Sequence, residues 1–162
     1  MSKGKLTFFC GKMAAGKSTL SKRIAQEQNA VLLSEDEWLE SLYPNKIKTL
    51  VHYIEFSNLL KPLVKKHVQL ILSTGTNVVM DFPANTVSQR AWLKSIYTEI
   101  NASHSLIYIK ADNEKCLRNL EKRRAEQPKR MKTDTIEMFE QVTQYFVEPQ
   151  TEEGFNITVT NN

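Results

Sequence analysis

Residues 11–18 read Gly-Lys-Met-Ala-Ala-Gly-Lys-Ser and match the phosphate-binding pattern G-x-x-x-x-G-K-[ST], also called Walker A, at every fixed position. The apolar run of residues 6–10 predicts a strand before this segment, and the helical spacing of residues 17–28 predicts a helix after it. The alternative is a glycine-containing turn into an ordinary helix, which would require neither the Lys-Ser pair nor both flanking elements. The pattern therefore predicts a loop that holds the phosphates of a nucleotide.

A few positions carry the chemistry of this loop. Gly11 and Gly16 permit backbone angles at which successive N–H groups turn toward an anion. Lys17 is expected to reach the outer phosphates and to act in catalysis, and the Ser18 hydroxyl is expected to bind Mg²⁺. The other candidate contacts to the nucleotide within and beside the loop are Lys12, Met13, Ala14, Ala15 and Thr19.

The rest of the chain alternates between strand and helix patterns. Short apolar runs predict strands at residues 6–10, 30–33, 78–82, 106–109 and 157–159. Helical spacing predicts helices at residues 17–28, 36–43, 52–72, 86–102, 113–127 and 135–147, with Pro62 expected to kink or split the third. This alternation predicts an α/β fold in which helices cover a parallel sheet and ligands bind at the carboxyl ends of the strands.

Length and composition narrow the class of protein. A chain of 162 residues is expected to form one domain, residues 1–162, and no apolar run reaches the roughly 18 residues that a membrane span needs. Cys10 and Cys116 are far apart and predict no disulfide, which suits a cytoplasmic protein. The Asn-Lys-x-Asp and Asp-x-x-Gly segments of a GTPase do not occur, and the three histidines lack metal-ligand spacing. A small kinase is the best remaining candidate.

The segment Ser-Glu-Asp-Glu-Trp at residues 34–38 follows the second predicted strand, on the same sheet edge as the phosphate loop. A carboxylate at this place is a natural general base for a substrate hydroxyl. The alternative is helix capping, with Ser34 as the N-cap and acidic residues in the first turn. Trp38 would either line an acceptor pocket or pack its helix onto the core.

Asp81 closes the apolar strand of residues 78–82, where its carboxylate would hold either a water bound to Mg²⁺ or a substrate hydroxyl. Pro83 and Asn85 are expected to shape the loop that follows, and Thr86 to start the next helix. The alternative is an ordinary turn with an exposed aspartate.

Positive charge is concentrated in one region. The net charge is +4, and residues 110–132 contain nine Lys or Arg against four acidic residues. Lys115, Arg118 and Lys122 share one helical face, where they would either neutralise a transferring phosphoryl group or form a solvated basic helix. Residues 133–153 contain six acidic residues and no Lys or Arg, which argues against a protein coated in positive charge.

Together these segments resemble the small P-loop kinase family that includes zeta toxins, chloramphenicol phosphotransferase and the kinase domain of polynucleotide kinase. The resemblance covers nearly the whole chain and is closest to a bacterial ATP-binding branch with segments similar to LLSEDEWLESLYP, VVMDFPANTVSQR and FVEPQTEEGFNI. It implies a P-loop NTPase fold of the nucleoside-monophosphate-kinase type, with a five-stranded parallel sheet of order 2-3-1-4-5. It also implies a mobile lid, near residues 118–132 here, and ATP with Mg²⁺ as the phosphoryl donor.

The resemblance assigns roles by position. Asp36 matches the general base after the second strand, and Asp81 matches the carboxylate after the third. Arg90 matches an arginine on the following helix, and Arg123 matches a catalytic arginine of the lid. Asn119 departs from the family, which usually has a second lid arginine at this position.

This departure leaves open whether Arg118, Arg124 or Arg130 takes the place of the second lid arginine; Arg118 is the candidate nucleotide contact. The His-Pro pair that usually follows the lid helix is Gln127-Pro128 here.

The leading hypothesis is an ATP-dependent kinase that phosphorylates a hydroxyl of a small molecule. Its candidate acceptor contacts are Asp36, Trp38, Asp81, Asn85 and Arg90, and its candidate Mg²⁺ ligands are Ser18 and Asp81. A kinase acting on the 5′ end of a nucleic acid is less favoured, because acidic residues 133–153 would repel a long polyanion near the site. A regulatory switch that binds ATP without transfer is the third hypothesis.

Overall fold

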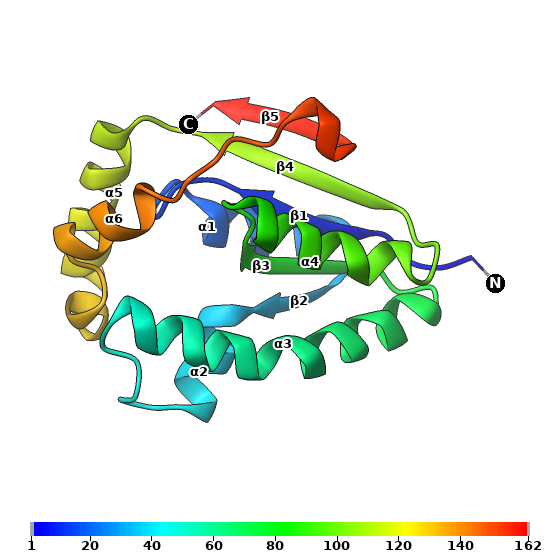
Figure 1. The fold of residues 1–162 in the computed structure, drawn as a ribbon, viewed down its shortest axis with the longest axis horizontal. Coiled ribbons are helices and arrows are strands. Elements are labelled where there is room, and N and C mark those ends of the chain that lie inside the picture. The colour runs from blue at the N-terminus through cyan, green and yellow to red at the C-terminus, as the bar shows by residue number, and fades with distance from the viewer. Residues whose placement is uncertain (1, 162) are drawn as a thin grey trace.

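Five parallel strands form one sheet in the computed structural model, which describes residues 2–161 (Figure 1). Met1 and Asn162, the end residues of the predicted domain 1–162, lie outside the described residues. The strand order is β2-β3-β1-β4-β5 and all neighbouring strands are parallel, so the expected order 2-3-1-4-5 is confirmed. The strands are β1 (Leu6–Cys10), β2 (Val31–Ser34), β3 (Val78–Pro83), β4 (His104–Lys110) and β5 (Ile157–Asn161).

The central position of β1 follows from its sequence. All five of its residues are buried, as a strand with helices on both faces requires. Because side chains alternate along a strand, Leu6, Phe8 and Cys10 join the core on one face and Phe9 joins the core on the other.

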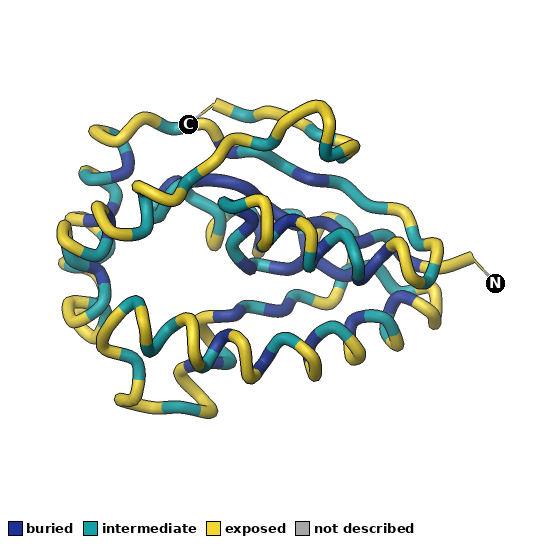
Figure 2. Tube along the Cα trace, in the orientation of Figure 1, coloured by how far each residue is buried: buried dark blue, intermediate teal, exposed yellow. Residues whose placement is uncertain are grey.

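Helices cover both faces of the sheet (Figures 1 and 2). One core cluster contains residues of α2 (Glu35–Leu42), α3 (Leu50–Ser73) and α4 (Val87–Thr98). The other contains residues of α1 (Lys17–Glu27), α5 (Asn113–Glu126) and α6 (Ile136–Thr143). Two short 3-10 helices, η1 (Pro128–Lys132) and η2 (Thr151–Glu153), complete the elements. Among the helices of residues 2–161, none combines the length and apolar character needed to cross a bilayer.

The long helix α3 packs through a single stripe. Leu60, Val64, Val68 and Leu72 recur every four residues and are at most 2% exposed. Each such side chain stabilises the fold by about 1.5–3 kcal/mol when it is removed from water. Pro62 lies on the exposed side, where the loss of one backbone hydrogen bond leaves the helix unbroken, so the expected split does not occur.

Some predicted boundaries were wrong. α4 ends at Thr98 rather than residue 102, because the chain turns at Asn101, which has a φ of 55°. α6 ends at Thr143 rather than residue 147, because the chain turns there: the backbone N–H of Phe146 donates to the carbonyl oxygen of Thr143, and no regular structure follows directly. The loop expected at residues 128–130 is part of η1.

The parallel register brings the candidate site together. Ser34 at the end of β2 pairs with Asp81 near the end of β3, and the phosphate loop begins directly after β1. The backbone N–H of Gly11 donates a 2.9 Å hydrogen bond to Asn85 Oδ1, which ties the phosphate loop to the loop after β3. Three separate chain segments therefore meet at one sheet edge.

Candidate functional site

The phosphate loop joins β1 to α1 through two residues with positive φ. Ala14 has a φ of 64°, and Gly16, at 113°, is the N-cap of α1. Such angles turn backbone N–H groups toward the inside of a loop, and glycine adopts them without strain. The loop thus has the geometry of an anion-binding loop, with the N-terminus of an 11-residue helix behind it.

Lys17 folds over this loop. Its ammonium group donates hydrogen bonds to the carbonyl oxygens of Gly11 (2.5 Å) and Lys12 (3.3 Å). Burial lowers the pKa of Lys17, while the nearby Asp81 carboxylate opposes that shift. These hydrogen bonds therefore hold the Lys17 ammonium group beside the first residues of the phosphate loop.

Ser18 and Asp81 form the candidate Mg²⁺ site. The Ser18 hydroxyl donates a 2.9 Å hydrogen bond to Asp81 Oδ2, so the loop and β3 contribute one oxygen group each. Burial raises the pKa of Asp81, the hydrogen bond from Ser18 lowers it, and repulsion by Asp36 raises it. Within residues 2–161, no cluster of three or more His, Cys, Asp or Glu is placed to bind a metal. One hydroxyl and one carboxylate nevertheless fit Mg²⁺, which keeps several waters and takes further oxygens from phosphates.

Asp36 lies in the first turn of α2 with an exposed side chain, 61% accessible. Its carboxylate acts on the pKa values of both Lys17 and Asp81, which places it in the same electrostatic neighbourhood. Ser34 Oγ also accepts from the backbone N–H of Glu37 at 3.4 Å, so the helix-capping interpretation describes this segment as well. The two interpretations are compatible, because Ser34 caps the helix while Asp36 lies near Lys17 and Asp81.

Two arginines of the predicted lid share one buried carboxylate. Asp134 is 1% exposed and accepts hydrogen bonds from Arg123 at 2.6 and 3.0 Å and from Arg130 at 2.9 and 3.5 Å. Arg130 also reaches Asp36 Oδ2 at 3.4 Å. These contacts join the segment after α5 to the first turn of α2.

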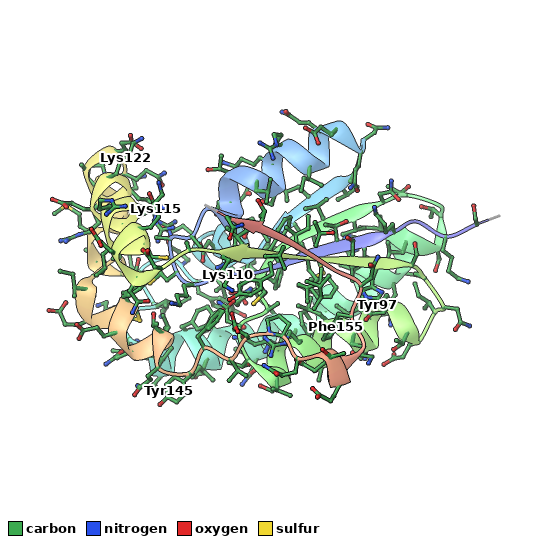
Figure 3. All side chains as sticks on the ribbon, turned by 90° about the horizontal axis from the view of Figure 1, so that it is seen from above. Tyr97, Lys110, Lys115, Lys122, Tyr145 and Phe155 are labelled. Atoms are coloured by element: carbon green, nitrogen blue, oxygen red, sulfur yellow. The ribbon has the colours of Figure 1, made fainter. Side chains whose placement is uncertain are left out.

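Asn119, at the position where the family usually has a second lid arginine, and its neighbour Arg118 make other contacts. Asn119 donates a 2.9 Å hydrogen bond to the carbonyl oxygen of Ala14, so it fastens α5 to the phosphate loop. Arg118 pairs with Glu114 on the helix surface at 2.8 Å. Lys115 and Lys122 lie along the same helix (Figure 3). Of the three arginines left open by sequence, Arg130 is the one joined to Arg123 through Asp134.

Arg90 sits inside the fold. It is 0% exposed, and its guanidinium donates to Glu153 Oε1 (2.8 Å) and to the carbonyl oxygens of Ala84 (3.0 Å), Val147 (2.8 Å) and Glu148 (3.4 Å). These partners hold the segment between α6 and β5 against the loop after β3. The geometry gives Arg90 a structural task, and its expected contact with the substrate stays a prediction.

Trp38 and Asn85 lie at the edge of the site. Trp38 is half-buried against the core, with its ring centroid 6.4 Å from that of His67. The side-chain carbonyl of Asn85 is engaged by Gly11, as described above. Another histidine, His104, is 4.0 Å from Tyr97 between ring centroids and also packs against Phe155, away from this edge (Figure 3).

A small pocket of about 60 Å³ lies beside the strand ends, between α2, α3 and α4. Glu35 in its wall is 3% exposed and accepts hydrogen bonds from the hydroxyls of Tyr53 and Ser57, the latter at 2.8 Å. Burial raises the pKa of Glu35 to about 7, against the two hydrogen bonds. Glu35 was not singled out from sequence, because there it is only one of the three consecutive acidic residues Glu35, Asp36 and Glu37.

A second, open pocket of about 570 Å³ adjoins the phosphate loop at Lys12. The ends of β4 and β5 form its floor, and Phe146 and Glu148 line it from the segment after α6. Tyr108 in this pocket donates a 2.7 Å hydrogen bond to Glu148 Oε1. The sequence patterns did not point to these residues.

Comparison with known proteins identifies the family. A family model described as an AAA domain matches residues 6–149. None of the curated proteins compared matches the chain.

Among solved structures, the Mycobacterium tuberculosis APS kinase CysC in complex with AMPPNP and APS is 16% identical, with a TM-score of 0.65 over 99% of this chain and 90% of that one. Chaetomium thermophilum Kti12 in complex with ADP-AlF3 is 15% identical, with a TM-score of 0.69 over 96% and 88%. A gluconokinase from Sinorhizobium meliloti 1021 is 11% identical, with a TM-score of 0.63 over 99% and 84%. At such identities the likeness concerns the fold. With its phosphate loop, its sheet of order 2-3-1-4-5 and the family model over residues 6–149, the chain belongs to the AAA-domain family and has the fold of a small P-loop kinase.

Proposed function

We propose that this protein transfers the γ-phosphate of ATP to a hydroxyl group of a small molecule. The observation that carries the proposal is the convergence of six side chains near one sheet edge. These groups are the Lys17 ammonium, the Ser18–Asp81 pair, the Asp36 carboxylate and the arginines held by Asp134. Positioning and charge neutralisation are the main demands of phosphoryl transfer, and these groups supply both.

ATP would bind along residues 11–19, with its phosphates on the backbone N–H groups of the loop and on Lys17. The pocket of about 570 Å³ beside Lys12 has the volume for a nucleoside. Arg118, at the surface of α5, remains a proposed nucleotide contact that would have to leave Glu114. Mg²⁺ would be held by Ser18 and Asp81, where it would neutralise the charge of the phosphate oxygens.

In the transfer itself, the acceptor oxygen forms a bond to the γ-phosphorus while the bond from that phosphorus to the bridging oxygen breaks and ADP leaves. Asp36 takes the proton of the acceptor hydroxyl. Arg123 and Arg130 face the charge that spreads over the transferred group. We further propose that residues 118–132 act as the lid of a single domain, since Arg130 contacts Asp36 and shares Asp134 with Arg123.

The experiment is a transfer screen with [γ-³²P]ATP and Mg²⁺ against sugars, amino alcohols, nucleosides, antibiotics and 5′-hydroxyl oligonucleotides. At least one small hydroxyl compound is expected to become labelled. Lys17→Ala is expected to lower transfer by roughly 10²-fold or more, because a preorganised positive charge is lost.

Asp36→Asn separates a kinase from an ATP-binding switch. The proposal expects ATP affinity to stay within about twofold while transfer falls by roughly 10²–10⁴-fold, the usual contribution of a general base. Glu37→Gln, one residue further along α2 and exposed, is the matched control. If no acceptor is labelled and the slow hydrolysis of ATP is equal in Asp36→Asn and Glu37→Gln, an ATP-binding switch is favoured, and labelling of oligonucleotides alone would favour a nucleic-acid kinase.

A further inference from the structure

The small pocket beside Glu35 is lined by residues that neighbour the proposed transfer site in the chain. Glu35 directly precedes Asp36 in the chain, and the lining residue Phe82 directly follows Asp81. The backbones of Ser34 and Asp81 are register partners in the sheet. The pocket lining therefore adjoins both carboxylates of the transfer site along the chain, and the Asp36 carboxylate is close enough to Glu35 to act on its pKa.

The pocket has a polar side and an apolar side. Glu35, Ser57 and the amide side chains of Asn58 and Gln89 are among its polar lining, while Phe82, Pro83 and Trp92 are apolar or aromatic. A carboxylate has about four positions for accepting hydrogen bonds, and Tyr53 and Ser57 use two of those of Glu35. Glu35 therefore keeps acceptor capacity for hydroxyl donors of a bound molecule.

The charges in this pocket disfavour a phosphorylated ligand. Lys61 is the one cation that lines it within the described chain, and the Lys61 ammonium lies 5.6 Å from the centre of the Trp92 ring. No arginine is among the lining residues of this pocket as described, whereas sites for phosphate groups typically use arginine forks or several cations. A phosphate beside Glu35 would also meet a carboxylate in a poorly hydrated place.

Its volume limits the ligand further. About 60 Å³ corresponds to the space of a few water molecules, which is too little for a nucleobase and enough for one edge of a polyol. We infer that this pocket binds the hydroxyl-bearing edge of a phosphate-free polyol such as a monosaccharide, with Glu35 accepting hydrogen bonds from its hydroxyl groups and Trp92 packing against its carbon face. The inference rests on the proposed function in one respect, because that molecule is the phosphoryl acceptor.

The two tryptophans allow a direct test of binding. In protein labelled with 5-fluorotryptophan, Trp92 reports on this pocket, and a Trp38→Phe variant assigns the two ¹⁹F signals. The probes are glucose, ribose, myo-inositol and glucosamine, their phosphorylated counterparts glucose 6-phosphate and ribose 5-phosphate, and a 5′-hydroxyl oligonucleotide. Each probe is titrated with and without the non-hydrolysable analogue AMPPNP.

At least one phosphate-free probe is expected to shift the Trp92 signal in a saturable manner, with an affinity at least tenfold higher than that of its phosphorylated counterpart. Glu35→Gln is expected to weaken this binding at least tenfold, and Ser57→Ala to weaken it less. Glu37→Gln, on the exposed side of the same helix, is expected to leave it unchanged. Circular dichroism and the dispersion of the ¹⁹F signals establish that each variant is folded.

Three results would overturn the inference: no phosphate-free probe shifts the Trp92 signal, phosphorylated probes bind as tightly, or Glu35→Gln binds like the wild-type protein in a folded state. The transfer screen tests the kinase activity independently of this binding experiment. A protein that binds a polyol at Trp92 but never labels it refutes the kinase and keeps the binding site, whereas labelling without a Trp92 shift keeps the kinase and refutes this pocket.

Discussion

Arg123 and Asp134 form a two-pronged ion pair in which Nε and one terminal nitrogen of the guanidinium donate to the two carboxylate oxygens at 2.6 and 3.0 Å. The carboxylate is buried and the guanidinium is partly exposed, so the acid fixes the direction in which the arginine can point. Asp134 was not singled out from sequence, where it is one of six acids between residues 133 and 153.

Asp134→Asn is expected to lower the rate of transfer on the order of 10²-fold, because Arg123 and Arg130 lose the group that aims them at the site. Unfolding free energy should fall by about 1–3 kcal/mol, since buried hydrogen-bond partners are lost. Steady-state kinetics and urea unfolding measure the two effects. Glu137→Gln, on the exposed surface of α6, is the control; an unchanged rate in folded Asp134→Asn would mean that Asp134 serves the fold alone.

Asp81→Asn is expected to remove most of the advantage that Mg²⁺ gives to ATP binding. The variant keeps an oxygen beside Ser18 but loses the negative charge that attracts the ion. Calorimetric titration of ATP with Mg²⁺, and again with EDTA, measures this difference without any need for an acceptor. Equal gains from Mg²⁺ in the variant and the wild-type protein would contradict the assignment of Asp81 as a metal ligand.

Arg90→Met is expected to destabilise the protein by about 3–5 kcal/mol, because Glu153 and the carbonyl oxygens of Ala84 and Val147 lose their donor inside the fold. Thermal and urea unfolding measure this loss. Lys94→Met is the comparison, since Lys94 bonds to the same segment through the Glu153 carbonyl oxygen but is less buried. A stable Arg90→Met protein with weakened acceptor binding would favour the substrate role expected from sequence.

Glu35 makes stability depend on pH. Its pKa is about 7 in the folded protein and near 4.5 for an ordinary glutamate, so the folded state binds the extra proton between these values. The contribution of Glu35 to the free energy of unfolding is therefore expected to be fully present below about pH 4.5 and to be lost as the pH rises through 7. Burial has the largest effect on this pKa and raises it. Tyr53, Ser57 and Lys61 from α3 lower it, and Asp36 from the same helix raises it.

Urea unfolding at pH 5, 6, 7 and 8 measures this decline. Asp81, whose pKa is also raised, contributes a slope of the same sign, so the informative quantity is the difference between wild-type protein and Glu35→Gln. Glu35→Gln should show a shallower decline, and Glu37→Gln should follow the wild-type curve. Parallel curves for Glu35→Gln and the wild type would contradict a proton on Glu35 near neutral pH.

The strands could be predicted from sequence because each is a short apolar run between amphipathic helices. Such runs are local features of the sequence, and the structure keeps each of them as a strand. The order 2-3-1-4-5 came from the resemblance, since strand pairing depends on contacts that no local pattern records. Helix ends were less predictable: the positive φ of Asn101 ends the turn after α4, whereas the apolar spacing continued.

The site divides in the same way. The phosphate loop and Asp81 could be proposed from sequence because a motif marks one and a strand end marks the other. The structure joins them through the hydrogen bond between Ser18 and Asp81, which are 63 positions apart. The partnership of Glu35 with Tyr53 and Ser57 depends on how α2 packs on α3, and the task of Arg90 depends on where residues 147–153 return. These are tertiary relationships, so residue type and spacing carried no sign of them.

The burial of Arg90 also bears on how the chain folds. Three of its four acceptors, including the only carboxylate among them, lie 57 to 63 positions further along the chain, so its charge stays uncompensated until that distant segment arrives. An intermediate with α4 docked on the sheet but residues 147–153 detached would bury an unpaired cation and is therefore unfavourable. Docking of α4 and of the final segment should accordingly be cooperative, and amide hydrogens in the two regions should exchange with similar opening free energies.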